Sequence, residues 1–175
     1  MGWQHVGWYV HASVCVRRRA KHAHARAVEH AHAGNGGLGH GDDTSQLAPA
    51  LVESFVHDGI KLKAVAVGTS HMLGLSTEGT VFSWGNCEYG RCGNGKSKQK
   101  SPQVVDLLAD KKVVAVAAGY THSLALDADG YVWVWGKNHA GQLGVGGTVL
   151  FDLNTMEEYP MKIELEGDDA HRFST

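Results

Sequence analysis

The sequence predicts an all-β fold, a partial β-propeller of about two full four-stranded blades plus a partial unit at each end. Two observations carry the prediction. Residues 64–95 and 115–146 align without a gap at a spacing of 51 positions, and 14 of the 32 aligned residues are identical. Both copies also alternate apolar and polar residues in short runs that glycine turns separate. Four-stranded units that recur about every 50 residues are typical of propeller blades.

Each element of the second copy has strand or turn chemistry. Residues 113–118 form an apolar, β-branched run, and residues 122–126 place two leucines on one face. Residues 127–130 read Asp-Ala-Asp-Gly, which favours a tight turn because glycine accepts a positive φ. Residues 131–135 alternate again, with valines on one face and aromatic residues on the other. We therefore expect a strand followed by an antiparallel hairpin, and the first copy keeps the same phase.

Three sequence motifs recur in the two copies. The second copy reads GYTHSLAL, GYVWVWG and GQLGVG, and the first reads GTSHMLGL, GTVFSWG and GRCGNG. This order resembles the repeat of the regulator of chromosome condensation family. Kelch and WD-type repeats fit less well, because the hairpin ends twice in Trp-Gly and no Gly-Gly doublet precedes its Tyr and Trp. The resemblance covers about residues 34–165 and implies a seven-bladed propeller.

The repeat pattern divides the chain into regions. The motif GGLGHG at residues 36–41 matches the third motif of both copies, which indicates the tail of an earlier blade. Pro49, Pro102 and Pro160 each open the outer part of a blade, where an edge strand tolerates proline. The expected regions are a low-complexity leader (1–33), the repeat region (34–165, divided into a blade tail and linker at 34–58, a repeat at 59–110, and a repeat with the start of the next at 111–165) and a tail (166–175).

The leader, residues 1–33, is expected to contain no strand and to be disordered or weakly helical. It contains three consecutive arginines and no acidic residue before Glu29, which are features of mitochondrial transit peptides, although serine is nearly absent. A mispredicted gene start is another alternative. His22 and His24, like His30 and His32, lie two positions apart and face different sides of a helix. Such pairs share an ion only in an extended chain, so we assign no metal site here.

Composition argues against two classes of partner. The chain has 175 residues, a net charge of −2 and a pI of about 6.6, so we expect no direct nucleic-acid or membrane binding. Its three cysteines are an odd number without framework spacing, which indicates a reducing compartment. We therefore expect an intracellular protein of the cytoplasm or nucleus, with mitochondrial targeting by the leader as the alternative.

One catalytic motif matches literally. Residues 90–97 read GRCGNGKS, which fits the phosphate-binding pattern G-x-x-x-x-G-K-S. That chemistry needs a strand directly before the loop and a helix directly after it. The following residues, KQKSP, have no helical period and reach a proline, and the second copy has Gly147 in place of the lysine. We therefore expect no nucleotide site and assign no cofactor.

The repeated polar and aromatic residues are interpreted as structural. His71 and His122 occupy equivalent positions, and a catalytic base is rarely needed twice, so we expect both to be buried in equivalent settings. Trp84 and Trp135 recur in the same way and are expected in the core between blades. No catalytic residue is assigned, and the chain is predicted not to be an enzyme.

Two further clusters contain residue types that can bind a metal ion or a charged partner. Cys87 and Cys92 are too few for a structural zinc site, and Cys92 takes the place of leucine in the other copies, which predicts a small apolar core residue. The lysines at 96, 98 and 100, with Arg91 near them, form a basic tip that is expected to be a solvated loop or, as the alternative, a contact for an acidic partner.

The function predicted from these observations is a non-catalytic propeller module that mediates protein–protein interaction. The family resemblance implies two alternatives, part of a guanine-nucleotide exchange factor for a small GTPase or the propeller region of a ubiquitin ligase. The partner is accordingly expected to be a small GTPase, a chromatin protein or a ubiquitin-pathway protein. Two blades and two partial units do not close a ring, so we expect a piece of a larger propeller that aggregates, oligomerises or stays partly unfolded when expressed alone.

Overall fold

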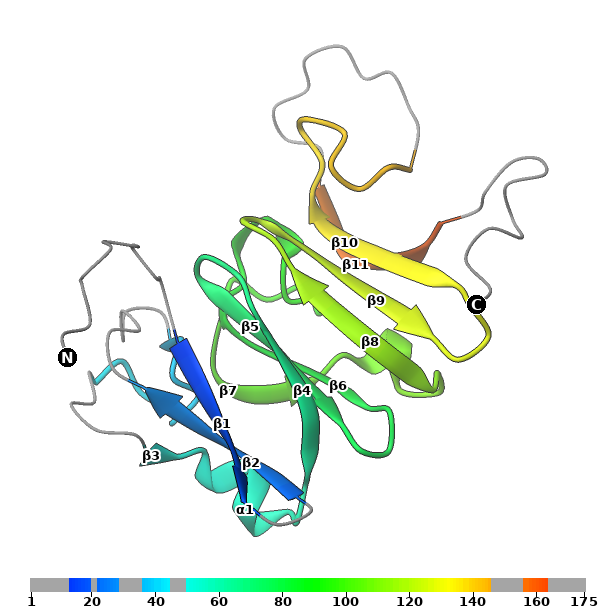
Figure 1. The fold of residues 1–175 in the computed structure, drawn as a ribbon. Helices are drawn as coiled ribbons and strands as arrows, with labels where there is room; N and C mark the ends of the chain where they lie inside the picture. Colours follow the sequence, from blue (N-terminus) through cyan, green and yellow to red (C-terminus); the bar gives the residue numbers. More distant parts are fainter. Residues whose placement is uncertain (1–12, 20–21, 29–35, 45–49, 146–155, 164–175) are drawn as a thin grey trace, which may run out of the picture.

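The computed structural model describes residues 13–19, 22–28, 36–44, 50–145 and 156–163. Within them, two antiparallel sheets lie side by side, each containing four consecutive strands of one repeat (Figure 1). Blade 1 consists of β4 (Leu62–Val67), β5 (His71–Ser76), β6 (Val81–Asn86) and β7 (Lys98–Val104). Blade 2 consists of β8 (Val113–Ala118), β9 (His122–Asp127), β10 (Val132–Lys137) and β11 (Met156–Lys162). The predicted all-β, partial propeller is confirmed, and its described blades form an open arc.

The two blades share one register and one irregularity. His71 of β5 lies opposite Gly85 of β6, and His122 of β9 lies opposite Gly136 of β10. At each of these glycines the pairing with the fourth strand shifts, as in a β-bulge. Gly85 has φ of 105° and Gly136 has φ of 107°, a backbone region that favours glycine. The repeated Trp-Gly motif is therefore the bulge that redirects the strand toward its outer neighbour.

The fourth strand of each blade is an edge strand that contains proline. Pro102 lies inside β7, which pairs with β6, and Pro160 lies inside β11, which pairs with β10. Among the described strands, neither has a second neighbour, so a missing backbone N–H disrupts no central ladder. The expectation of edge strands at these two prolines is confirmed, whereas Pro49 lies outside the described residues.

Part of the leader forms strands, contrary to expectation. β1 (Ser13–Arg19) and β2 (His22–Val28) pair antiparallel along their whole length. β2 also pairs with β3 (Ala50–Leu51) and, at Ala23, with Leu62 of β4, so the hairpin extends the sheet of blade 1. The expectation of a leader without strand pattern is wrong for these residues. The sequence of β2, HAHARAV, alternates with a period of two, which is the period of a strand.

Three short helical segments complete the described structure. They are α1 (Glu53–His57), η2 (Glu88–Gly90) and η3 (Asp106–Leu108). α1 lies in the segment expected to be a linker, and it buries Phe55 against blade 1. Of the helices that the structure describes, none has the length and hydropathy needed to cross a bilayer.

Two hydrophobic cores lie on opposite faces of blade 1. Neighbouring strand residues point to opposite faces, so Leu73 packs toward blade 2 while Met72 packs toward α1. The core between the blades contains Leu73, Leu75, Val81, Val105, Leu108, Val113, Ala125 and Trp135. The core beneath α1 contains Val52, Phe55, Leu62, Met72, Phe82 and Trp84. Trp135 is thus buried in the core between the blades, as expected, whereas Trp84 is buried in the core beneath α1.

Candidate functional site: the docking loop and the loop face

The segment between β6 and β7 of blade 1, residues 87–95, contacts blade 2, and we call it the docking loop. The backbone carbonyl of Arg91 in this loop accepts two hydrogen bonds from blade 2, from Ser123 Oγ at 2.8 Å and from Trp135 Nε1 at 2.9 Å. One repeat earlier, the carbonyl of Gly37 accepts a hydrogen bond from Trp84 Nε1 at 3.1 Å. The same contact therefore recurs: each indole donates to the loop of the preceding unit.

Glycine lets the indole ring lie directly on this loop. A Cβ atom on Gly93 would lie 2.9 Å from Trp135 Nε1, and one on Gly39 would lie 3.1 Å from Trp84 Nε1. Real Cβ atoms rarely approach a neighbour so closely, so the glycines of the third motif are needed for contact between units. The prediction that residues 36–41 are the tail of an earlier unit agrees with this geometry, since Gly37 and Gly39 contact Trp84 as Arg91 and Gly93 contact Trp135.

His71 is a buried structural residue of the same contact. Its Nε2 lies 2.8 Å from Ser123 Oγ, and the single Ser123 hydroxyl proton is donated to the Arg91 carbonyl. Nε2 of His71 must then carry the proton that Ser123 accepts, which leaves Nδ1 without a proton and without a partner among the described residues. Burial lowers the pKa of His71 to about 3, helped by the charges of Arg91 and His122, so the ring is neutral.

His122 does not repeat this setting, which corrects the expectation of equivalent burial. The backbone positions correspond, but His71, Leu73 and Leu75 are covered by blade 2, whereas His122 is only half-buried. Burial still lowers the pKa of His122. The difference arises because burial on this face depends on the neighbouring unit and not on the strand that carries the residue.

Acidification is expected to destabilise the chain through His71. Its folded pKa of about 3 lies below its ordinary value of 6.5, so between these values the unfolded state binds more protons. The stability is therefore fully present above about pH 6.5 and declines toward pH 3, by at most about 1.4 kcal/mol per pH unit. Denaturant titrations between pH 7 and pH 4.5 measure this slope. His71→Gln, which cannot titrate, should show a shallower slope, and equal slopes would contradict the assignment.

The literal phosphate-binding motif lacks the helix that its chemistry needs. Gly93 donates its N–H to the carbonyl of Gly90 at 2.8 Å, so this amide is used within the turn. The residues after the motif enter β7 instead of a helix, and therefore no helix N-terminus faces a phosphate. Among the residues that the structure describes, no group of three or more His, Cys, Asp or Glu is placed to hold a metal ion.

The structure corrects the interpretation of the cysteines. Cys87 and Cys92 are joined by a disulfide bond across the docking loop, with their Cα atoms 5.0 Å apart. Cys92 is fully buried, as expected from its alignment with leucine, but it is not a free apolar side chain. The turn at Gly90 brings the two cysteines together, and residue counting alone does not reveal this proximity.

The basic tip is also smaller than expected. Lys98 and Lys100 both form ion pairs with Asp43, at 2.9 Å and 2.8 Å, and these lysines hold the pKa of the Asp43 carboxyl at about 2. Arg91 is buried and donates from Nε to the carbonyl of Glu88 at 2.7 Å. Only Lys96 of this cluster is exposed without an ion pair among the described residues. Two of the three lysines are therefore already neutralised by Asp43, although their side chains are exposed.

Two tyrosines that the repeat pattern does not identify are exposed at this edge of the blades. Tyr120, between β8 and β9, is 71% exposed, and Tyr89, in the docking loop, is 45% exposed. Both lie close enough to the Arg91 guanidinium to oppose the lowering of its pKa, which burial causes. The second and first copies carry Ala140 and Thr69 at the equivalent positions, so the only available signal was an aromatic residue that the repeat does not require.

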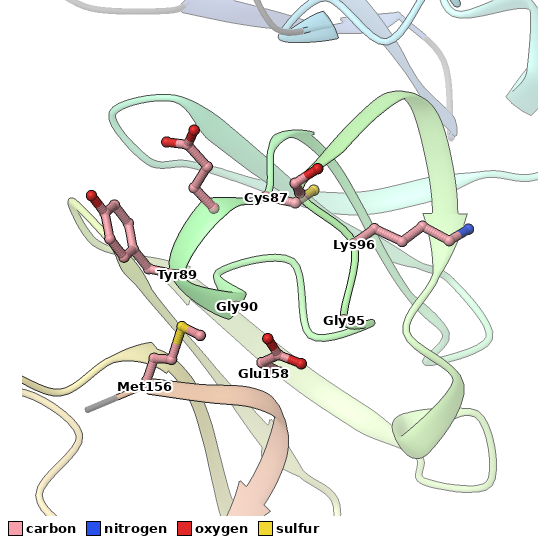
Figure 2. A pocket seen from close by; sticks show the side chains of 9 residues that line it. Cys87, Tyr89, Gly90, Gly95, Lys96, Met156 and Glu158 are labelled. Atoms are coloured by element: carbon pink, nitrogen blue, oxygen red, sulfur yellow. The ribbon is translucent and has the colours of Figure 1, made fainter. Parts of the chain in front are cut away.

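Tyr89 is held in an unusual backbone conformation beside a pocket. Its φ is 60°, and Lys137 Nζ lies 4.5 Å from the centre of its ring. The pocket, of about 430 Å³, opens between the docking loop and β11 and is flanked by Tyr89, Met156 and Glu158, while Lys96 extends away from it (Figure 2). We call the edge that carries Tyr89, Tyr120 and this pocket the loop face.

Comparison with known families decides the relationship. Two models of the regulator of chromosome condensation (RCC1) repeat match the chain, one at residues 78–126 and 129–174 and the other at residues 62–91 and 113–142. The chain belongs to the RCC1 repeat family. The Trp-Gly bulge described above therefore occurs in each of two consecutive RCC1 repeats, and the docking loop forms the contact between them.

The chain is similar to segments of longer proteins. It is 44% identical over 110 residues to the E3 ubiquitin-protein ligase HERC2 of Homo sapiens, a match that covers 62% of this chain and 2% of HERC2. It is 39% identical over 111 residues to the mitochondrial RCC1 domain-containing protein RUG3 of Arabidopsis thaliana, covering 63% of this chain and 24% of RUG3. The fold resembles Prp20p of Saccharomyces cerevisiae with a TM-score of 0.64 at 22% identity, covering 83% of this chain and 34% of Prp20p.

Proposed function

We propose that this RCC1-repeat chain is a non-catalytic module that binds a protein partner through its loop face. The observation that carries the proposal is the exposure of Tyr120 and Tyr89 at an edge where the repeated histidine, tryptophan and glycine residues serve the contact between blades. Exposed aromatic residues on a rigid framework are typical of the centres of protein interfaces.

The geometry of the loop face supports binding rather than chemistry. Arg91 lies 5.5 Å and Lys137 4.5 Å from the centre of the Tyr89 ring, and these contacts orient the ring before any partner arrives. A pre-oriented tyrosine loses little conformational entropy on binding. The residues that line the pocket beside it include two carboxylates, Glu88 and Glu158, and one lysine, Lys96, so their net negative charge favours a basic side chain of the partner.

The class of partner follows from the relatives and is part of the proposal. The 44% identity to HERC2 favours a role as the propeller region of a ubiquitin-pathway protein. Prp20p was described with its binding to Gsp1p and histones, but at 22% identity it supports the fold and not the partner. We place the module inside the cell, in the cytoplasm or nucleus. The mitochondrion is the alternative, because the similar protein RUG3 is named as mitochondrial.

Replacing the two loop-face tyrosines is expected to abolish partner binding without unfolding the chain. Tyr120→Ser removes the most exposed aromatic side chain, and Tyr89→Asn keeps a residue type that accepts the positive φ at this position. The measurement is affinity capture with the 175-residue chain, followed by titration of each captured and identified protein against the purified chain and its variant. We expect the double variant to weaken binding at least tenfold.

Tyr131→Ser is the matched control. Tyr131 is 47% exposed and its ring also contacts a lysine, with Lys162 Nζ at 3.8 Å from its centre, but it lies at the opposite end of the β9–β10 hairpin. The control should bind as the unmodified chain does. Equal weakening by the control, or full binding by the loop-face variant, would exclude this face as the contact surface.

A further inference from the structure

The disulfide of the docking loop is an addition to the repeat and not a part of it. Cys87 and Cys92 align with Asn138 and Leu143 of the second copy. We propose that this cysteine pair is a reversible thiol–disulfide modification site that sets the rigidity of the docking loop. Its reaction partner is a dithiol, either a small molecule or a protein with two neighbouring thiols. The proposal is independent of the interaction function, because its test measures the oxidation state of the cysteines and the stability of the chain, and not partner binding.

The second copy shows how the same turn is held without a covalent bond. Asn138 accepts a hydrogen bond at its Oδ1 from the N–H of Leu143 at 3.1 Å, and its carbonyl accepts one from Gly141 at 3.0 Å. A side-chain hydrogen bond thus spans in blade 2 the positions that the disulfide spans in blade 1. The turn persists without a disulfide in blade 2, so reduction is expected to loosen the blade 1 turn rather than to destroy it.

Each thiol released by reduction has a hydrogen-bond acceptor within reach. Cys87 Sγ lies 3.5 Å from the carbonyl of Gly85, and Cys92 Sγ lies 3.9 Å from the carbonyl of Asn86. A free cysteine is a small apolar residue with a weak S–H donor, which suits both buried positions. The site therefore accommodates the oxidised and the reduced form with the same neighbours.

The Cys87–Cys92 disulfide constrains the part of the docking loop that contacts blade 2. Arg91, whose carbonyl accepts hydrogen bonds from Ser123 and Trp135, lies between the two cysteines. Gly93, on which the Trp135 indole lies, follows directly after Cys92. Breaking the cross-link frees both ends of this short turn, so the hydrogen bonds to blade 2 become easier to open.

The pocket of the loop face determines which sulfur reacts first. Cys87 lines the pocket, together with Tyr89, Gly95 and Met156 (Figure 2), whereas Cys92 does not, although both side chains are buried, at 1% and 0% exposed. A dithiol therefore reaches Cys87 from the pocket side when the docking loop opens. The reductant's thiolate attacks Cys87 Sγ, the S–S bond breaks, and the Cys92 thiolate leaves and takes up a proton. The second thiol of the reductant then resolves the mixed disulfide, which releases Cys87 as a thiol and leaves the reductant oxidised by two electrons. An oxidised dithiol reverses both steps.

The experiment compares the 175-residue chain with and without dithiothreitol under native conditions. Differential alkylation with peptide mapping should show Cys87 and Cys92 blocked before reduction, labelled after it, and blocked again after reoxidation with oxidised dithiothreitol. Reduction should lower Tm by about 4–8 °C, the effect expected for removing a short disulfide loop from a chain of this size. Hydrogen exchange at the docking-loop amides should speed up in the reduced form.

The matched control is the double variant Cys87→Asn with Cys92→Leu, which installs the residues of the second copy. Its Tm should not respond to dithiothreitol. Two results on the unmodified chain overturn the proposal even if this variant fails to fold. One is labelling of both cysteines before any reduction, and the other is reduction that occurs only in denaturant, since a site closed to dithiols in the folded chain is not a reversible modification site.

Discussion

Replacing Trp135 with alanine is expected to lower the free energy of unfolding by about 3–5 kcal/mol, the usual cost of truncating a buried aromatic residue. Trp135 is fully buried in the core between the blades, and its Nε1 donates to the Arg91 carbonyl at 2.9 Å. The variant loses the packing of the indole and opens a cavity at the contact between two repeats. Urea or guanidinium titration of both chains measures the difference, with the m value as a check on compactness.

Trp135→Phe separates packing from hydrogen bonding. It keeps most of the apolar volume and removes only the indole N–H, while the Arg91 carbonyl still accepts a hydrogen bond from Ser123 Oγ. We expect a loss of about 0.5–1.5 kcal/mol for the hydrogen bond, plus a small packing term. A change below about 1 kcal/mol for Trp135→Ala would mean that the indole does not join the blades.

The repeat allowed most of the fold to be predicted, because the repeated residues serve the contacts between units. An ungapped alignment locates the strands and the hairpin turns of both blades, and the structure confirms them. The bulge at Trp-Gly is visible only in the strand pairing of the structure. The same alignment predicts the burial of Trp84 and Trp135, since a residue that recurs in every unit is explained by a contact that recurs in every unit.

Features that the two copies do not share could not be predicted from their alignment. Tyr89 and Tyr120 occupy positions where the copies differ, and the distance between Cys87 and Cys92 depends on the turn at Gly90. The strands of the leader have no counterpart in the repeat, and the period-two alternation of β2 is the sequence signal that indicates them. The exposure of His122 depends on what covers blade 2, which its own strand sequence does not specify.

Alanine at Gly85 is expected to destabilise the chain by about 2–5 kcal/mol, through backbone strain and overpacking together. Gly85 has φ of 105° at the bulge of blade 1, and a Cβ atom there would lie 2.6 Å from the carbonyl oxygen of Ser70 and 2.9 Å from Cα of His71. Both obstacles are backbone atoms of the neighbouring strand, so neither moves aside as a flexible side chain would. Relief of the clash requires β5 and β6 to separate next to His71.

Gly130→Ala measures the conformational part of this effect alone, so the difference between the two variants gives the steric part. Gly130 has a positive φ of 87°, but nothing lies within 4 Å of the Cβ position, so alanine there adds only the conformational cost of about 1–2 kcal/mol. Denaturant titration should therefore rank the chains as unmodified, Gly130→Ala and Gly85→Ala in decreasing stability, and a Gly85→Ala chain that is too unstable to titrate should still show reduced soluble yield beside the control. Equal stability of the two alanine variants would mean that β5 and β6 do not approach each other as closely as this bulge requires. The Trp-Gly motif would then act through backbone conformation alone, and an asparagine at Gly85, which accepts a positive φ but still carries a Cβ, would be tolerated.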